Sequence, residues 1–167
     1  MEVSVAEVKA LREKTGAGVM ACRNALLEAN GNMDTATEIL RQRGLAQAKK
    51  KASRVASQGL VETYVHAGGR IGAMVEVNCE TDFVARTDQF KELAHNLAMQ
   101  VAAIAPTYVS ADQIPPGQEV DPKEACLLQQ PFIRDPDKSV QDIVDETIAK
   151  VSENVVVRRF ARFELGN

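Results

Sequence analysis

The chain has 167 residues, of which 45% are hydrophobic, enough for the packed core of one ordinary domain or two small ones. No stretch approaches the roughly 20 consecutive apolar residues of a membrane span. Residues 1–4 show neither the basic nor the apolar region of a secretory signal, so we expect a cytoplasmic protein with no membrane partner. A net charge of −3 argues against a dedicated nucleic-acid binder. The three cysteines (Cys22, Cys79 and Cys126) are too widely spaced for a CxxC zinc site.

Three short helices are predicted in residues 1–45. Ser4 and Glu7 have the spacing of a capping box, and Gly16 can end the first helix in the left-handed conformation. The second helix is predicted from about residue 19 to 29, and the third from about residue 32 to Gly44. Helices this short do not fold alone, so we expect residues 1–45 to share one small core.

Residues 46–59 keep the helical spacing of apolar side chains up to Gly59 and carry Lys49, Lys50, Lys51 and Arg54. The segment is therefore predicted to be a basic helical linker. A solvated helix face explains the lysines most simply, and a contact with RNA or an acidic partner is the alternative.

Beyond Gly59 the hydrophobic period changes from helical to alternating. Residues 60–66 and 71–78 alternate around the glycine-containing turn 67–70, which predicts a hairpin. Residues 155–165 alternate as a third strand.

Two longer helices are predicted to cover this sheet. Thr87 or Asp88 caps the first helix, which carries an apolar stripe and stops before Pro106. A capping box at Ser139 and Asp142 opens the second helix. All six prolines fall between these two helices, so residues 106–138 are predicted to be an irregular connection.

The expected fold class is α+β. Residues 1–45 form a helical domain, residues 46–59 a helical linker, and residues 60–167 a three-stranded antiparallel sheet packed with helices.

The candidate catalytic motifs do not fit their chemistry. Gly16 to Ala21 matches the GxGxxA spacing, but a dinucleotide site needs a preceding strand and here a helix precedes it. Cys79 and His66 could form a nucleophile and base, yet the predicted hairpin separates them by about 26 Å. His66 and His95 lack metal-ligand spacing. We therefore expect no enzyme, no cofactor and no metal.

Residues 78–86 hold the most unusual local pattern, because an acid and an aromatic ring stand side by side where a strand ends. In one interpretation Phe83 enters the core and Asp82 caps a turn. In the other, the pair is a rigidly held wedge offered to a partner. The residues alone favour the core interpretation.

Three segments together resemble the elongation factor Ts family. Residues 11–26, from Leu11-Arg12 through Thr15-Gly16-Ala17-Gly18 to Ala25-Leu26, are similar to its N-terminal signature. Residues 75–85, Val-Glu-Val-Asn-Cys-Glu-Thr-Asp-Phe-Val-Ala, are similar to its second signature, and residues 153–159 also fit. The resemblance covers almost the whole chain.

The resemblance implies a UBA-like N-terminal domain and a function as the guanine nucleotide exchange factor of elongation factor Tu. In this role Asp82 and Phe83 enter the GTPase domain near its magnesium and switch regions, which moves Phe83 from the core to the wedge. The residues expected to touch elongation factor Tu are Thr81, Asp82, Phe83, Val84, His66, Arg12, Val19, Met20 and Arg23.

Two departures from the family pattern bear on assembly. The chain has room for one core module, as in short members that work as homodimers, whereas long members carry two. His66 and Phe83 lie at opposite ends of the predicted hairpin, so one partner meets both most easily by contacting two subunits. Residues 119–126 are also much shorter than the helical insertion usual at this place.

Two other function classes make different predictions. A general protein-binding adaptor, such as one for ubiquitin-like proteins, would bind without releasing nucleotide. A small RNA-binding protein using residues 49–54 would lose affinity steeply with salt. Direct nucleic-acid binding is not expected.

Overall fold

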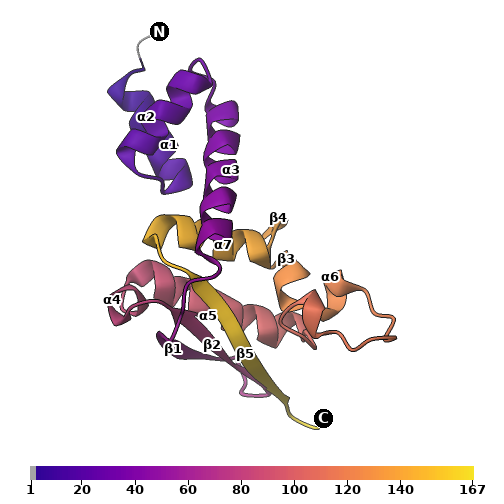
Figure 1. Ribbon diagram of the computed structural model, residues 1–167. Coiled ribbons are helices and arrows are strands. Elements are labelled where there is room, and N and C mark those ends of the chain that lie inside the picture. The colour runs from indigo at the N-terminus through magenta and orange to yellow at the C-terminus, as the bar shows by residue number, and fades with distance from the viewer. Residues whose placement is uncertain (1–2) are drawn as a thin grey trace.

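The computed structural model describes residues 3–167, and it has a helical unit at one end and a sheet unit at the other (Figure 1). Residues 1 and 2, which open the segment compared with a secretory signal, lie outside the described part. The helical unit contains α1 (Val5–Thr15), α2 (Val19–Glu28) and the first half of α3 (Met33–Lys51).

The helical unit begins and turns where its capping residues predict. Ser4 and Glu7 form the capping box, and Gly16 ends α1 in the left-handed conformation with a φ of 68°. Asn32 caps α3 by accepting a hydrogen bond from the backbone N–H of Thr35. The helices enclose a separate small core made of Val8, Leu11, Cys22, Ala25, Leu26, Ala29 and Ala36. The prediction of three helices sharing one core is confirmed.

The third helix is longer than expected and the linker helix does not exist as a separate element. α3 passes through Gly44 and ends at Lys51, and the following residues 52–57 are not helical. The predicted end at Gly44 and the helical spacing up to Gly59 are therefore both wrong. Gly44 is tolerated inside the helix because α3 packs closely on another helix there: an added Cβ would lie 3.4 Å from the Cβ of Ala149.

Three antiparallel strands form the main sheet: β1 (Gln58–Val65), β2 (Ile71–Cys79) and β5 (Val155–Glu164). Their spatial order is β1-β2-β5, with the hairpin strand β2 in the centre. The hairpin register places Cys79 opposite Gln58, and the turn is closed by a hydrogen bond from the His66 N–H to the Ile71 carbonyl (2.9 Å). The expected hairpin and third strand are confirmed.

Helices α5 (Asp88–Ile104) and α7 (Val140–Val151) complete the sheet unit (Figure 1). Thr87 caps α5, and Ser139 with Asp142 forms the capping box of α7. Alternate residues of β2 face α5 in the core, including Val75 and Val77. In residues 3–167 no helix covers the opposite face of the sheet, which exposes large apolar side chains that include Val61, Val65, Met74, Val156 and Phe163. The expected α+β class, helices followed by a three-stranded antiparallel sheet, is confirmed.

The proline-containing segment has more structure than an irregular connection. It contains η1 (Ala111–Gln113), α6 (Pro122–Ala125), η2 (Leu127–Gln129) and a second small sheet of β3 (Pro131–Phe132) and β4 (Asp135–Ser139). Buried amides hold it to α5. Gln100 donates to the side-chain oxygen of Gln130 and to the carbonyl of Pro131, and it accepts from the Ile133 N–H. Such long-range bonds leave no local periodicity for a sequence pattern to reveal.

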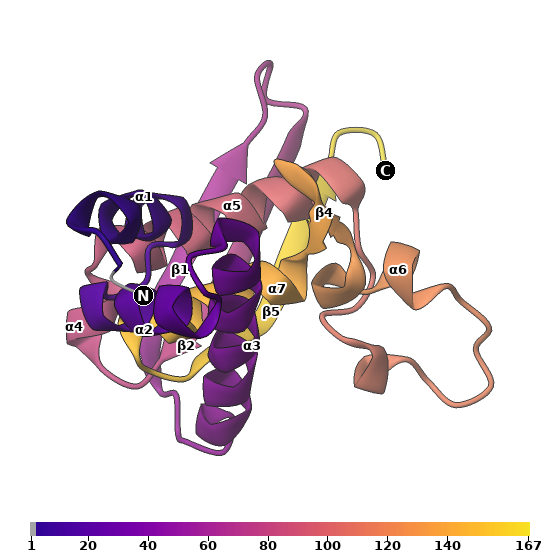
Figure 2. The ribbon, with the colours of Figure 1, turned by 90° about the horizontal axis from the view of Figure 1, so that it is seen from above.

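Seen from above, the segment carrying α6 extends to one side and the helical unit lies on the other (Figure 2). No helix in residues 3–167 has the length and apolar character needed to cross a bilayer.

Candidate functional site

The acid and aromatic pair lies on a single helical turn, α4 (Asp82–Ala85), between the end of β2 and the start of α5. Thr81 caps this turn by accepting a hydrogen bond from the Val84 N–H. Phe83 is 77% exposed, whereas Ala85 is buried and Val84 packs partly against the core. The core interpretation of Phe83 is therefore wrong, because the helical turn directs Ala85 inward and Phe83 outward.

Asp82 stands beside the ring with its charge partly neutralised. Its carboxylate pairs with the guanidinium of Arg86, one turn further along the chain, and both side chains are substantially exposed. An apolar ring thus projects next to a carboxylate and a guanidinium. Exposed aromatic rings that are held rigidly are typical anchors of protein–protein interfaces.

A carboxylate from a distant part of the chain holds the start of α4. Glu153 accepts hydrogen bonds from the backbone N–H groups of Glu80 (3.1 Å) and Thr81 (3.0 Å), and from the Thr81 hydroxyl (2.6 Å). The Thr81 hydroxyl therefore links α4 to Glu153 within the protein. Sequence reasoning assigned Glu153 no role, because 72 residues separate it from Thr81 and no local pattern links them.

The thiol next to this turn is not a nucleophile. Cys79 is fully buried, and its Sγ donates to the Thr81 carbonyl at 3.1 Å. Burial, with a smaller contribution from the charge of Glu153, raises the pKa of Cys79 to about 11. Reactive cysteines have a depressed pKa and partial exposure. The register of the hairpin also places this thiol at the opposite end from His66, so the predicted separation is confirmed.

His66 is exposed beside the hairpin turn. Within the described residues its imidazole has one hydrogen-bond partner, Tyr64, whose hydroxyl lies 3.1 Å from Nδ1. The turn projects away from α4 (Figures 1 and 2). The structure thus keeps His66 and Phe83 apart.

The four expected contact residues of the helical unit are all exposed. Val19 and Met20, at the start of α2, are 53% and 61% exposed. Arg12 and Arg23 are exposed as well, and within residues 3–167 neither has an ion-pair partner. In both views α1 and α2 lie toward the same side of the molecule as α4 (Figures 1 and 2).

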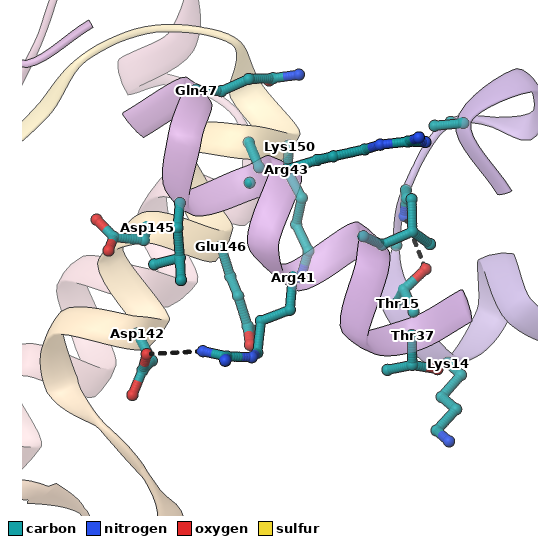
Figure 3. Close-up of a pocket in the computed structure, with 18 of the residues that line it drawn as sticks. Lys14, Thr15, Thr37, Arg41, Arg43, Gln47, Asp142, Asp145, Glu146 and Lys150 are labelled. Carbon is teal, nitrogen blue, oxygen red and sulfur yellow. Dashed lines mark hydrogen bonds and ion pairs between the residues drawn. The ribbon is translucent and has the colours of Figure 1, made fainter. Parts of the chain in front are cut away.

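A cavity of about 300 Å³ lies between α3, α7 and the loop joining α1 to α2 (Figure 3). The Gly16–Gly18 loop lines it, together with charged groups that are mostly engaged already. Arg41 is 3.9 Å from Asp142, and Lys138 is 2.7 Å from Glu146. A helix precedes the glycine loop, so the strand–turn–helix geometry of a nucleotide site is absent here. Across residues 3–167 no three acidic, histidine or cysteine side chains gather as a metal site.

Comparisons with known proteins identify the family of this chain. A family model described as Elongation factor TS matches residues 35–120 and 118–167. Elongation factor Ts of Moorella thermoacetica is 50% identical over 194 residues, covering 98% of this chain and 96% of that protein. Elongation factor Ts of Carboxydothermus hydrogenoformans is 51% identical over 189 residues, covering 95% and 87%.

The chain therefore belongs to the elongation factor Ts family. The alignments are longer than the chain's 167 residues, so these relatives contain residues that have no counterpart here. The two matches to the family model overlap at residues 118–120, at the start of the segment predicted to be shortened.

Proposed function

We propose that this protein is the guanine nucleotide exchange factor of elongation factor Tu and promotes GDP release during translation elongation in the cytoplasm. Family membership supports the role in elongation. The observation that supports the mechanism is Phe83, a large apolar ring 77% exposed on a turn that is capped and held in place. The protein itself makes and breaks no bond.

In the proposed mechanism, Phe83 and Asp82 insert beside the nucleotide site of the GTPase domain. Mg²⁺ in such sites bridges the nucleotide phosphates and protein oxygens, so displacing its surroundings removes a large favourable charge interaction. The exchange factor need not touch GDP. If it binds the nucleotide-free GTPase more tightly than the loaded form, linkage requires it to weaken nucleotide binding by the same factor. A ten-thousand-fold effect needs about 5.5 kcal/mol of differential binding.

The helical unit supplies the second proposed contact with the same domain. Val19 and Met20 offer exposed apolar surface, and Arg12 and Arg23 offer exposed cations near them. Interface anchors are commonly apolar or Arg side chains surrounded by weaker contacts. We expect these residues to orient the factor while α4 disturbs the nucleotide site.

We further propose that the protein works as a homodimer. His66 is the third proposed contact, and it lies at the opposite end of the hairpin from the segment that leads to Phe83. One GTPase would then meet Phe83 of one subunit and His66 of the other. The uncovered sheet face supports this assembly, because Val61, Val65, Met74 and Phe163 are exposed on it.

The decisive experiment follows the release of a fluorescent GDP analogue from elongation factor Tu after the protein is added. We expect the wild type to accelerate release and Phe83→Ala to do so at least about 30-fold less, the effect of an interface anchor worth about 2 kcal/mol. Leu165→Ala removes another exposed apolar side chain (67%) and should behave as the wild type.

The same experiment separates the other function classes. Binding to a partner without GDP release would favour an adaptor. Affinity for RNA that falls steeply with salt would instead favour an RNA-binding role for Lys49 to Arg54. No acceleration by folded wild type would contradict the proposed function.

A further inference from the structure

The turn between α7 and β5 holds two other segments of the chain at once. Ser152 ends α7 in the left-handed conformation, with a φ of 59°, and the next two residues point in different directions. Glu153 binds the end of β2 and the N-cap of α4, as described above. Asn154 is 3% exposed and donates from Nδ2 to the carbonyls of Ala52 (3.4 Å) and Arg54 (2.8 Å).

A second set of contacts, made by Glu80, joins these segments to one another. The Glu80 carboxylate accepts from the Asn154 N–H at 2.7 Å and lies 3.5 Å from the Arg54 guanidinium. The chain that leaves α3, the turn after α7 and the start of α4 are therefore tied to one another by side chains whose hydrogen bonds are all internal. The same group of hydrogen bonds therefore holds both the chain that leaves the helical unit and the turn that carries Phe83.

The bonds from Glu153 add to the cap that Thr81 provides for α4. Four residues of helix cannot hold their shape alone, because nucleation fixes several residues for one hydrogen bond. A carboxylate that accepts from two backbone N–H groups and one hydroxyl makes charge-assisted bonds, which are about twice as strong as neutral ones. Without these bonds the direction in which Phe83 points would no longer be fixed.

We propose that Glu153 and Asn154 are positioning residues for nucleotide exchange: Glu153 fixes α4 so that Phe83 projects in one direction, and Asn154 fixes the helical unit relative to it. This inference rests on the proposed function. Neither residue touches the partner. Both act through the geometry of residues that do.

The test measures the maximal rate of GDP release and the half-saturating concentration separately. In Glu153→Ala, contacts made by the helical unit remain, so the half-saturating concentration should change by less than about threefold while the maximal rate falls about tenfold. Glu153→Gln should recover most of the rate, since its amide can accept from the two N–H groups and donate to the Thr81 hydroxyl. Glu146→Ala, which removes another partly buried carboxylate from the helix that precedes this turn, should keep the wild-type rate.

A double-mutant comparison shows whether Glu153 acts through α4. If it does, Glu153→Ala should add less than about twofold to the defect of Phe83→Ala, because the wedge is already lost. Native-state hydrogen exchange of the Glu80 and Thr81 amides provides a readout without the partner, and both should exchange faster in Glu153→Ala. Should this variant fail to fold, Thr81→Val takes its place: it removes both the bond from the hydroxyl to Glu153 and the cap on the Val84 N–H. Thr81→Ser keeps a hydroxyl for both bonds and is the conservative control.

The outcomes are distinct. Wild-type release by Glu153→Ala, fully multiplicative effects with Phe83→Ala, or unchanged amide protection would each overturn the inference while leaving the exchange function in place. Absence of release by the wild type would overturn the proposed function and this inference together.

Discussion

The helical unit and the sheet unit each expose apolar side chains, but they hold them differently. Val19 and Met20 lie at the start of α2, where the N-cap is Gly18 and no side chain caps the helix. Phe83 lies on α4, where Thr81 caps the turn and Glu153 binds the N–H groups of the two residues before it. In the proposed function, Phe83 is therefore an anchor whose orientation is fixed by bonds to the core, whereas Val19 and Met20 add contact area from a helix end without a side-chain cap.

The core of the helical unit contains smaller side chains than the core of the sheet unit. Small side chains such as Ala25 and Ala36 make up much of the helical core, around Leu11 and Leu26. The sheet unit buries Phe90, Leu93 and Leu97 against the strands. Because buried apolar area sets much of the stability, we expect the sheet unit to be the more stable of the two.

The largest expected effect is on the free energy of unfolding, and it compares substitutions of two glycines, one in each unit. Gly59 in β1 has a φ of 143°, and an added Cβ would lie 2.1 Å from the Val77 carbonyl oxygen. Gly59→Ala should therefore cost about 3 kcal/mol of unfolding free energy, since backbone must move. Gly16→Ala meets only the flexible end of Lys150, at 2.8 Å, and should cost about 1 kcal/mol for its left-handed φ.

Urea denaturation of both variants measures these costs. Equal losses would contradict the view that the sheet is the rigid unit.

The second prediction compares the two exposed anchors in binding. Phe83→Ala should weaken binding to nucleotide-free elongation factor Tu by about 2 kcal/mol, and Met20→Ala by about 0.5 kcal/mol, because the rim of an interface contributes little. Calorimetric titration of both variants gives the two values. A larger loss for Met20→Ala would reverse the assignment of anchor and rim.

The third prediction concerns the exposed face of the sheet unit and its part in forming a homodimer. Phe163→Asp places a charge on the uncovered sheet face, where the aromatic ring is 73% exposed, and should convert a homodimer into monomers without unfolding the chain. Sedimentation of this variant beside the wild type reports the change. A wild type that is already monomeric and fully active in exchange would remove the homodimer from the account.

The last prediction concerns the thiol beneath α4. Burial raises the pKa of Cys79 from its ordinary value of 9.0 to about 11, so the folded chain keeps this proton where the unfolded chain loses it. The stabilising contribution of the thiol is complete below pH 9 and is lost as the pH rises toward 11. The unfolding free energies of wild type and Cys79→Ala should therefore converge over that interval. A constant difference would contradict the burial of this group.

Local signals in the sequence predicted much of the fold. Ser4, Thr87 and Ser139 cap helices as their spacing predicts, and the glycine turn closes the hairpin. Gly44 was misleading because close packing against Ala149 overrides the usual cost of glycine in a helix.

The site was less accessible to sequence reasoning. The residues alone favoured the interpretation in which Phe83 enters the core, and only the resemblance to a family moved it outward. The hydrogen bonds that hold the start of α4 were not predicted, because Glu153 and Thr81 are 72 residues apart in the sequence. Contacts of this kind are set by the tertiary fold, and neither propensity nor spacing encodes them.

The most direct test of the central claim is the affinity of this protein for elongation factor Tu in two states, nucleotide-free and loaded with GDP and Mg²⁺. Linkage predicts that the nucleotide-free form binds much more tightly, by the same factor with which the protein weakens GDP binding. Equal affinities for the two forms would contradict an exchange function, however tightly either one binds.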